Sequence, residues 1–574
     1  MRKTIPYAVS NYVELVDDNG YFVDKTHYVA KLERIKNPVF LRPRRFGKSL
    51  WCRILEMYYS VNHVDDFERL FGDTYIGQNP TGRQNSYIVL HFDFSKIDPG
   101  HSLDDLESSF SHSCNLRMRT VVGQAQIWFQ DRIEIDLKTK AWQNLDLILS
   151  TIAQYGLPPL YVIIDEYDNF ANHLITTHQD RFYGQLTADD SFLRTFFKVL
   201  KEGRKTGVIA NVFITGVLPM TIEELASSFN IATYLTLDPE FESMLGFTQP
   251  EVDHLLDDIY QDYAIDPSTR NEVNELIKNQ YDGYHFVSFD GETLYNSTIL
   301  LYFLRDFTRF KQIPEFLTDL NLRTDLSWIK RLTGRNPANT ENLLTQLTND
   351  NSILYNRTHL TSKFTTSQFF EPDFYPISFF YLGMLTRQDQ FVMKLPNLNM
   401  RQIFVEYFNE FHNIDSSACY ADMMRSFIAN PDIERLFSDY WTHYVSQLPE
   451  VIFQQVNENF YRTTFYALCS HYLSGWFSFN VERSYPKGKS DLEFVGKYHE
   501  KFAGLRWVIE FKYYSNSDFK RLFSTSLAAF EVQEADTVQI GGYVDGLRKE
   551  YPEAQIAQFV IYCVGNQGFR VFKI

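Results

Sequence analysis

Short apolar runs alternate with longer amphipathic stretches over the first 245 residues of the chain. We predict strands at the apolar runs, which cover residues 37–41, 87–94, 160–164, 208–214 and 232–237. Most of the segments between them are long enough for crossover helices, which is typical of a parallel sheet. The pattern therefore predicts an α/β domain over residues 1–245, with a parallel sheet and flanking helices.

The pattern changes after residue 245. Residues 246–445 have mostly helical periodicity, as in EVDHLLDDIY and STILLYFLRDF, and they predict a helical middle or lid region. Residues 446–574 predict a third domain of mixed α/β structure. Its expected order is a helix over 458–473, strands over 477–482, 491–495 and 507–512, a second helix, and strands over 559–564 and 569–572.

Composition and charge narrow the class of protein. No window approaches 18 consecutive apolar residues, so we expect no membrane span. The five cysteines lie far apart and form no CxxC, so they give neither a zinc-ligand spacing nor a disulfide framework, and we expect a reducing cytoplasm. The net charge of −17 argues against bulk electrostatic coating of nucleic acid. Residues 451–574, however, hold 14 Lys and Arg against 13 Asp and Glu, so this part repels phosphate least.

A phosphate-binding motif follows the first predicted strand. The segment RPRRFGKS ends in Gly47, Lys48 and Ser49, directly before a predicted helix. In a P-loop, backbone N–H groups at this helix start hold phosphates, the lysine neutralises the β and γ oxygens, and the serine binds Mg²⁺. Arg42 occupies the position of the first glycine of the usual pattern. On these residues alone, a basic turn before a buried helix is the alternative.

Two further strand ends suit the same nucleotide site. The strand LYVII ends in Asp165 and Glu166, which fit a Walker B pair that holds Mg²⁺ and polarises the attacking water. The strand VFI ends at Thr215, the candidate sensor of the γ-phosphate. Acids that are solvated or cap a helix, and an ordinary Thr-Gly turn, are the alternatives. The order of the three features is the one a P-loop ATPase requires.

Seven short segments together resemble the AAA-ATPase-like family: FVDKT, RPRRFGKS, IIDEYD, FITGV, GFT, YDGY and LYNS. Arg42 in place of the first glycine matches that family's own pattern. The resemblance implies that Arg44 or Arg45 contacts phosphate. It also implies a PD-(D/E)XK nuclease domain, of restriction-endonuclease-like fold, after the ATPase.

The C-terminal part contains a D…(D/E)xK pattern. Asp491 lies in the predicted strand SDLEF, and Glu510 and Lys512 lie in the strand WVIEFK. Two neighbouring strands would bring the two acids to one Mg²⁺ or Mn²⁺ site. Lys512 shares a face with Glu510 because side chains of a strand alternate with a period of two. We expect it to orient the attacking water or to stabilise the transition state.

Other residues join this pattern before and after it. Glu458, in the upstream helix, would add an acid to the metal site. Gln539 and Tyr543 have the QxxxY spacing of the exonuclease-type branch of the superfamily, although Gly541 and Gly542 weaken the expectation of a regular helix there. The alternative is an ExK pair on a solvated strand edge. This alternative is less favoured because Asp491, Glu458 and the QxxxY spacing accompany the pair.

Together these features predict an ATP-binding and ATP-hydrolysing enzyme coupled to a metal-dependent nuclease. The expected cofactors are ATP and Mg²⁺ or Mn²⁺, and the expected partner is nucleic acid, DNA rather than RNA; a homo-oligomer is compatible with the sequence. The resemblance suggests a role in defence against phage or mobile elements. The alternative is a nucleotide-dependent switch or assembly protein whose nuclease-like domain only binds. That alternative gains if Asp491, Glu510 and Lys512 do not converge in space.

Overall fold

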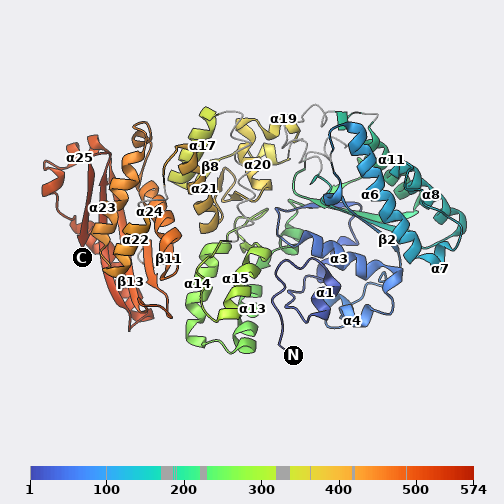
Figure 1. Cartoon of the computed structure of the whole chain (residues 1–574), viewed down its shortest axis with the longest axis horizontal. Coiled ribbons are helices and arrows are strands. Elements are labelled where there is room, and N and C mark those ends of the chain that lie inside the picture. Colours follow the sequence, from blue (N-terminus) through green and yellow to red (C-terminus); the bar gives the residue numbers. More distant parts are fainter. Residues whose placement is uncertain are drawn as a thin grey trace. The chain divides into compact units, whose positions relative to one another are not determined.

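The computed structural model describes residues 2–98, 100–169, 185–186, 188, 191–219, 229–318, 337–361, 364–415, 420–486 and 488–574 (Figure 1). The chain forms two compact units. The first contains Met1–Asp258, Tyr284–Leu301 and Tyr355–Phe391, and the second contains Ile259–Gly283, Tyr302–Leu354 and Val392–Ile574. The middle of the sequence thus contributes to both units, while the division at residues 245 and 445 remains a prediction.

The first unit is built around a parallel sheet of five strands in the order β2-β3-β4-β1-β5. The strands are β1 (Pro38–Leu41), β2 (Ile88–Asp93), β3 (Leu160–Asp165), β4 (Ile209–Gly216) and β5 (Thr233–Tyr234). The predicted α/β fold is confirmed; β1 and β2 differ from their apolar runs by one residue at one or both ends, whereas β5 covers only two residues of its run. β1 and β3 are buried along their whole length, which explains their continuous apolar sequence.

Helices cover both faces of this sheet (Figure 1). On β2, His91 contacts Glu56 of α3 (Lys48–Tyr59), whereas the next residue, Phe92, contacts Phe196 of α11 (Phe192–Thr206). Neighbouring side chains on a strand point to opposite faces, so α3 and α11 lie on opposite sides. α6 (Leu103–Gln124) and α8 (Ala141–Tyr155) pack with α11 in one layer.

The middle of the chain is mostly helical, as predicted. Its longer described helices are α13 (Gln249–Tyr263), α14 (Arg270–Tyr281), α15 (Ser297–Phe310), α17 (Pro337–Asp350), α21 (Leu398–Phe411), α22 (Tyr420–Ala429) and α23 (Ile433–His443). No helix in the described part of the chain is long and apolar enough to cross a membrane.

The second unit contains a mixed sheet in the order β11-β12-β13-β14-β15, in which only β13 and β14 run parallel. The strands are β11 (Phe477–Tyr485), β12 (Gly488–Gly496), β13 (Leu505–Tyr514), β14 (Gln555–Val564) and β15 (Gly568–Lys573). Two helices cover its faces, α24 (Glu458–Leu473) and α26 (Glu534–Glu550). On β13, Phe511 contacts Phe465 of α24, and Val508 packs in a core with Ile540 of α26.

α26 runs as a regular helix through Gly541 and Gly542. The buried side chains Ile540, Tyr543 and Leu547 anchor it to the sheet on both sides of the two glycines. Tertiary packing therefore outweighs the low helix propensity of glycine at this position.

The described cysteines are free and buried: Cys52, Cys114, Cys469 and Cys563. Cys419 lies outside the described residues. The prediction that the cysteines build no disulfide framework is consistent with this arrangement of the four.

Candidate nucleotide and metal sites

The segment between β1 and α3 has the geometry of a phosphate-binding loop. Gly47 caps the helix with a φ of +92°, a left-handed conformation that favours glycine. Lys48 is buried, and its Nζ donates hydrogen bonds to the carbonyl oxygens of Arg42 and Pro43 at 3.0 and 2.9 Å. Burial lowers the pKa of Lys48 because its ammonium group lacks water and has only neutral carbonyls as direct partners.

Arg42 stabilises the loop through contacts of its buried side chain. Its side chain is buried, with the guanidinium 4.3 Å from the ring centre of Phe40 and 4.2 Å from that of Phe286. The same guanidinium donates to three backbone carbonyls, those of Leu41, Thr236 and Glu242. Arg42 is thus a structural residue. These contacts of the Arg42 side chain explain why this loop has arginine at the position where other P-loops have glycine.

Arg44 and Arg45 differ in how they face the site. Arg44 is exposed, and its charge acts on Lys48 and on Glu166. The backbone carbonyl of Arg45, by contrast, accepts a hydrogen bond from the N–H of Thr298 at 3.1 Å. Arg44 thus acts electrostatically on the site, and which of the two arginines contacts phosphate remains a prediction.

The LYNS segment also holds this loop. Asn296 Nδ2 donates to the carbonyl of Arg44 at 3.2 Å, and Ser297 Oγ donates to the carbonyl of Arg45 at 3.3 Å. A segment about 250 residues downstream thereby fixes the backbone beside Gly47. This contact explains why a short polar motif so far away accompanies the P-loop.

Two acids follow the end of β3. Asp165 is buried, and its carboxylate forms a hydrogen bond with Ser49. Burial raises the pKa of Asp165, and the bond to Ser49 opposes that shift. Glu166, at a φ of +48°, also has a raised pKa because of burial, which the charge of Lys48 opposes. The structure therefore brings Lys48, Ser49, Asp165 and Glu166 together.

Thr215 and Asp168 stabilise the neighbouring strand end. Thr215 is buried, and its hydroxyl donates to the carbonyl of Phe40 at 2.8 Å, so its role as a phosphate sensor remains a prediction. Asp168 accepts hydrogen bonds from the N–H groups of Val217 and Leu218, at 3.2 and 2.8 Å. Asp168, the last acid of the segment IIDEYD, thus holds the backbone that follows β4.

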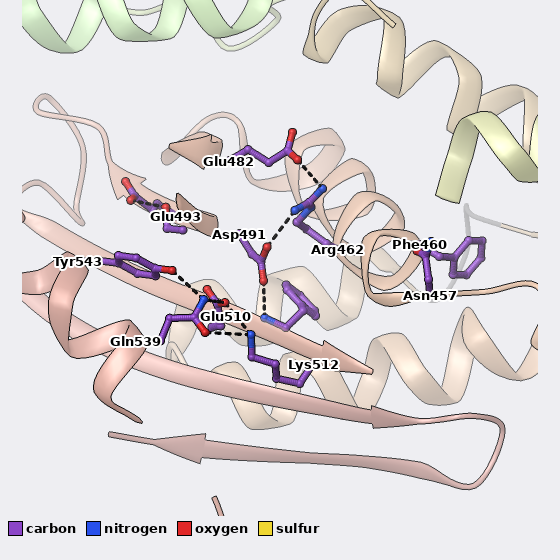
Figure 2. Close-up of polar contacts among 12 residues, drawn as sticks. Asn457, Phe460, Arg462, Glu482, Asp491, Glu493, Glu510, Lys512, Gln539 and Tyr543 are labelled. Atoms are coloured by element: carbon purple, nitrogen blue, oxygen red, sulfur yellow. Dashed lines mark hydrogen bonds and ion pairs between the residues drawn. The ribbon is translucent and has the colours of Figure 1, made fainter. Parts of the chain in front are cut away.

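The second site lies on the C-terminal sheet (Figure 2). Leu492 pairs with Ile509 in the antiparallel register of β12 and β13, which places Asp491 opposite Glu510. Asp491 Oδ2 accepts a hydrogen bond from the N–H of Phe511 at 2.8 Å. Lys512 Nζ lies 2.9 Å from Glu510 Oε1. Asp491, Glu510 and Lys512 therefore converge, as the nuclease pattern requires.

Gln539 and Tyr543 reach this site from α26, one turn apart. The amide group of Gln539 donates to Glu510 Oε1 and to the hydroxyl of Tyr543, and its oxygen accepts from Lys512 Nζ at 3.2 Å. Both members of the QxxxY spacing are thus in the same hydrogen-bond network as the metal-site pair (Figure 2).

Arg462 and Glu482 also belong to this site, and the sequence reasoning missed them. Arg462 is buried on α24; its Nη1 lies 2.9 Å from Asp491 Oδ1 and its Nη2 lies 3.0 Å from Glu482 Oε1. Glu482 has a φ of +55° and interrupts the pairing of β11 with β12. Although burial opposes it, the charges of Arg401 and Arg462 lower the pKa of Glu482 to about 2. A signal was present, since Arg462 follows Glu458 by one helical turn.

Glu458 stands at the first position of α24. Asn457 caps the helix, because its side chain accepts a hydrogen bond from the N–H of Phe460 (Figure 2). Burial raises the pKa of Glu458 to about 7, and the negative charge of Asp491 adds to the shift. Glu458 therefore lies close enough to Asp491 for the two acids to affect each other electrostatically.

The two oxygens of the Glu510 carboxylate differ in their hydrogen-bond contacts. Burial raises its pKa, and the charge of Asp491 raises it further, while Lys512 opposes the shift. Its Oε2 is buried and, within the described part of the chain, has no hydrogen-bond partner. This oxygen and the carboxylates of Glu458 and Asp491 together form a set of hard oxygen donors. Such a set fits a divalent cation.

Two segments of the chain match known families. Residues 6–226 match a family described as predicted AAA-ATPase. Residues 456–573 match the PD-(D/E)XK nuclease superfamily. No curated protein matches the chain. Both matched segments contain the side chains that converge in the two sites.

Proposed function

Because the chain joins a predicted AAA-ATPase domain at its N-terminus to a PD-(D/E)XK nuclease superfamily domain at its C-terminus, we propose that it hydrolyses ATP and cuts phosphodiester bonds in nucleic acid. One observation carries the nuclease part of this proposal. Asp491, Glu510 and Lys512 meet at one point of the sheet, next to an oxygen of Glu510 that lacks a partner.

Asp491 and Glu510 would hold Mg²⁺ or Mn²⁺, with Glu458 as a further acid. When bound, the cation would lower the pKa of a water molecule and stabilise the leaving oxygen. Lys512 holds a positive charge beside Glu510 and is suited to orient the water or to stabilise charge on the phosphate. Gln539 and Tyr543 fix Lys512 and Glu510 from the helix side and would contact the nucleic-acid backbone.

At the other site, Lys48 and the helix start would bind the β- and γ-phosphates of ATP. Ser49 and Asp165 share a hydrogen bond and form the pair that would hold Mg²⁺. Glu166 would polarise the attacking water, and Arg44 would neutralise phosphate charge. The proximity of Lys48, Asp165 and Glu166 at the start of α3 supports an ATPase.

We propose DNA rather than RNA as the substrate, and a role in defence against phage or mobile elements as the setting. The nearly balanced charge of residues 451–574 supports nucleic acid as the partner, because the rest of the chain is strongly acidic. The defence role is supported by the family resemblance of the ATPase and nuclease motifs.

The substrate is tested with the full-length chain and end-labelled single-stranded DNA, duplex DNA and RNA. Each is incubated with Mg²⁺ or Mn²⁺, with and without ATP, and with Ca²⁺ as a control cation. We expect metal-dependent cleavage of DNA and a change of rate with ATP. Binding of DNA that depends on ATP, without any cleavage, would instead identify a nucleotide-dependent switch.

A further inference from the structure

A cavity of about 640 Å³ lies beside the predicted Mg²⁺ ligands of the ATPase site. Its lining includes Ser49, Asp165 and Glu166, and on the other side Arg117 and Cys114 of α6. This space is larger than one hydrated cation between Ser49 and Asp165 would require. The lining also contains His91, which has no role in the proposed binding of phosphate or Mg²⁺.

Beside this cavity, three side chains from three elements of the first unit come together, and two of them, His91 and Asp165, line it. The Sγ of Cys52 on α3, a ring nitrogen of His91 on β2 and a carboxylate oxygen of Asp165 on β3 all lie within 4.8 Å of one another. Cys52 and Asp165 are buried, and the side chain of His91 is 10% exposed. Ligand atoms of a tetrahedral zinc ion lie roughly 3.5 Å apart, since zinc–ligand bonds measure about 2.0–2.3 Å. Small side-chain rotations would close the remaining difference.

His91 is oriented as a metal-binding histidine. Its Nδ1 lies 2.6 Å from Glu56 Oε2, and Arg117 Nη2 lies 2.6 Å from the other oxygen of Glu56. The carboxylate therefore holds the proton on Nδ1 and leaves the lone pair on Nε2. That Nε2 is buried and has no hydrogen-bond partner among the residues that the structure describes. A carboxylate behind a histidine is the usual outer shell of a zinc ligand, because it fixes both the ring and its tautomer.

We propose that Cys52, His91 and Asp165 form a Zn²⁺ site that inhibits the ATPase. A thiolate, an imidazole and a carboxylate suit zinc, whereas Mg²⁺ prefers oxygen ligands alone. The adjoining cavity leaves room for water as a fourth ligand. Zinc at this site takes the carboxylate of Asp165, which the proposed ATPase needs for Mg²⁺. The inhibition rests on the proposed function, but the binding of the metal does not.

Metal binding is tested with Co²⁺ as a spectroscopic substitute for zinc on the metal-free, full-length chain. We expect one equivalent of Co²⁺ to produce a thiolate-to-cobalt charge-transfer band, and one equivalent of Zn²⁺ to remove it. Cys52→Ala should lose the band. Cys114→Ala is the matched control, because Cys114 is also buried and lines the cavity but is outside the cluster, and it should keep the band. Glu56→Gln should weaken the affinity by about tenfold or more.

Inhibition is tested by titrating Zn²⁺ into the ATPase assay at constant Mg²⁺. Turnover of the wild type and of Cys114→Ala should fall by about tenfold or more and recover with a zinc chelator, while Cys52→Ala should resist. Thermal melting of Cys52→Ala and Cys52→Ser identifies any variant that has lost its fold. No cobalt–thiolate band in the wild type, or the same band in folded Cys52→Ala or Cys52→Ser, overturns the site. A band that depends on Cys52 in a protein without ATPase activity leaves the metal site standing and refutes the proposed ATPase.

Discussion

The two candidate sites each contain a lysine that burial deprives of water, yet the pKa values of the two lysines move in opposite directions. The pKa of Lys48 is lowered, because burial dominates and its hydrogen-bond partners are neutral carbonyls. The pKa of Lys512 is raised. Burial acts against this shift, but the carboxylate of Glu510 lies 2.9 Å away and outweighs it.

The difference shows which charge each site still needs. The direct partners of the Lys48 ammonium group are neutral carbonyls, and the acids Glu166 and Asp165 offset its burial only in part, so a phosphate would supply further negative charge. Lys512 already has its anion in Glu510, and the second site brings together three acids, Glu458, Asp491 and Glu510, with a buried Glu510 oxygen that has no hydrogen-bond partner among the described residues. The first site is therefore built to receive an anionic ligand, and the second to receive a cation.

The largest effect is expected for Lys48→Ala. ATP turnover should fall on the order of 10³-fold, because the cation that stabilises the γ-phosphate is lost. Glu166→Gln is the matched variant. It should slow turnover while ATP still binds, since the amide keeps the shape of the side chain but does not polarise water. Steady-state hydrolysis and ATP binding by calorimetry measure both, and unchanged turnover in Lys48→Ala would refute the P-loop assignment.

Lys512→Met should reduce the rate of DNA cleavage by about 100-fold and leave ATP turnover unchanged. Methionine keeps the aliphatic length but removes the charge that acts on the transition state. The rate is best compared over a pH series, because Lys512 lowers the pKa of Glu510 and its loss raises that pKa further. A variant that cleaves as fast as the wild type would show that Lys512 only balances the charge of Glu510.

Arg462→Met should weaken Mn²⁺ binding by about tenfold to 100-fold, because Arg462 positions the carboxylate of Asp491 without being a ligand itself. Arg462→Lys should recover part of the loss, since it restores the positive charge but not the second contact to Glu482. Calorimetry with Mn²⁺ measures the affinity. If Mn²⁺ binds more tightly to Arg462→Met, the arginine competes with the cation instead of positioning its ligand.

The smallest effect is a dependence on pH. The pKa of Glu458 is raised from 4.5 to about 7, so this group favours the folded protein most below pH 4.5, and that stability is lost as the pH rises through about 7. Mn²⁺ binds the ionised acids and should reverse the loss. Melting temperatures between pH 5 and about pH 8, with and without Mn²⁺, test this sign. Glu458→Gln should flatten the metal-free profile.

Much of the fold was predictable because its elements are local patterns. β1, β2, β3 and β4 coincide with apolar runs, and α24 has the predicted bounds. The main candidates were predictable for a similar reason. Gly47, Lys48 and Ser49 are adjacent in sequence, and Asp491 and Glu510 each lie within a short, specific pattern.

Apart from Arg462, which follows Glu458 by one helical turn, the missed residues depend on contacts between distant elements and were not predictable. Glu482 enters the metal site only where a left-handed residue interrupts the pairing of β11 and β12. The contact of Glu56 with His91 joins a helix to a strand, and each residue alone resembles a solvated polar position. Arg42 departs from the usual pattern for a reason that only its packing between Phe40 and Phe286 supplies.

The central claim is that Asp491 and Glu510 hold the cation that cleaves nucleic acid. The most direct measurement compares Mn²⁺-dependent cleavage of labelled DNA by the full-length wild type with that of Asp491→Asn and Glu510→Gln, after melting has shown that all three are folded. We predict that each substitution lowers the cleavage rate by more than about 100-fold, because a direct ligand should matter more than an outer-shell partner, and leaves ATP turnover intact. Full cleavage by either folded variant would contradict the account.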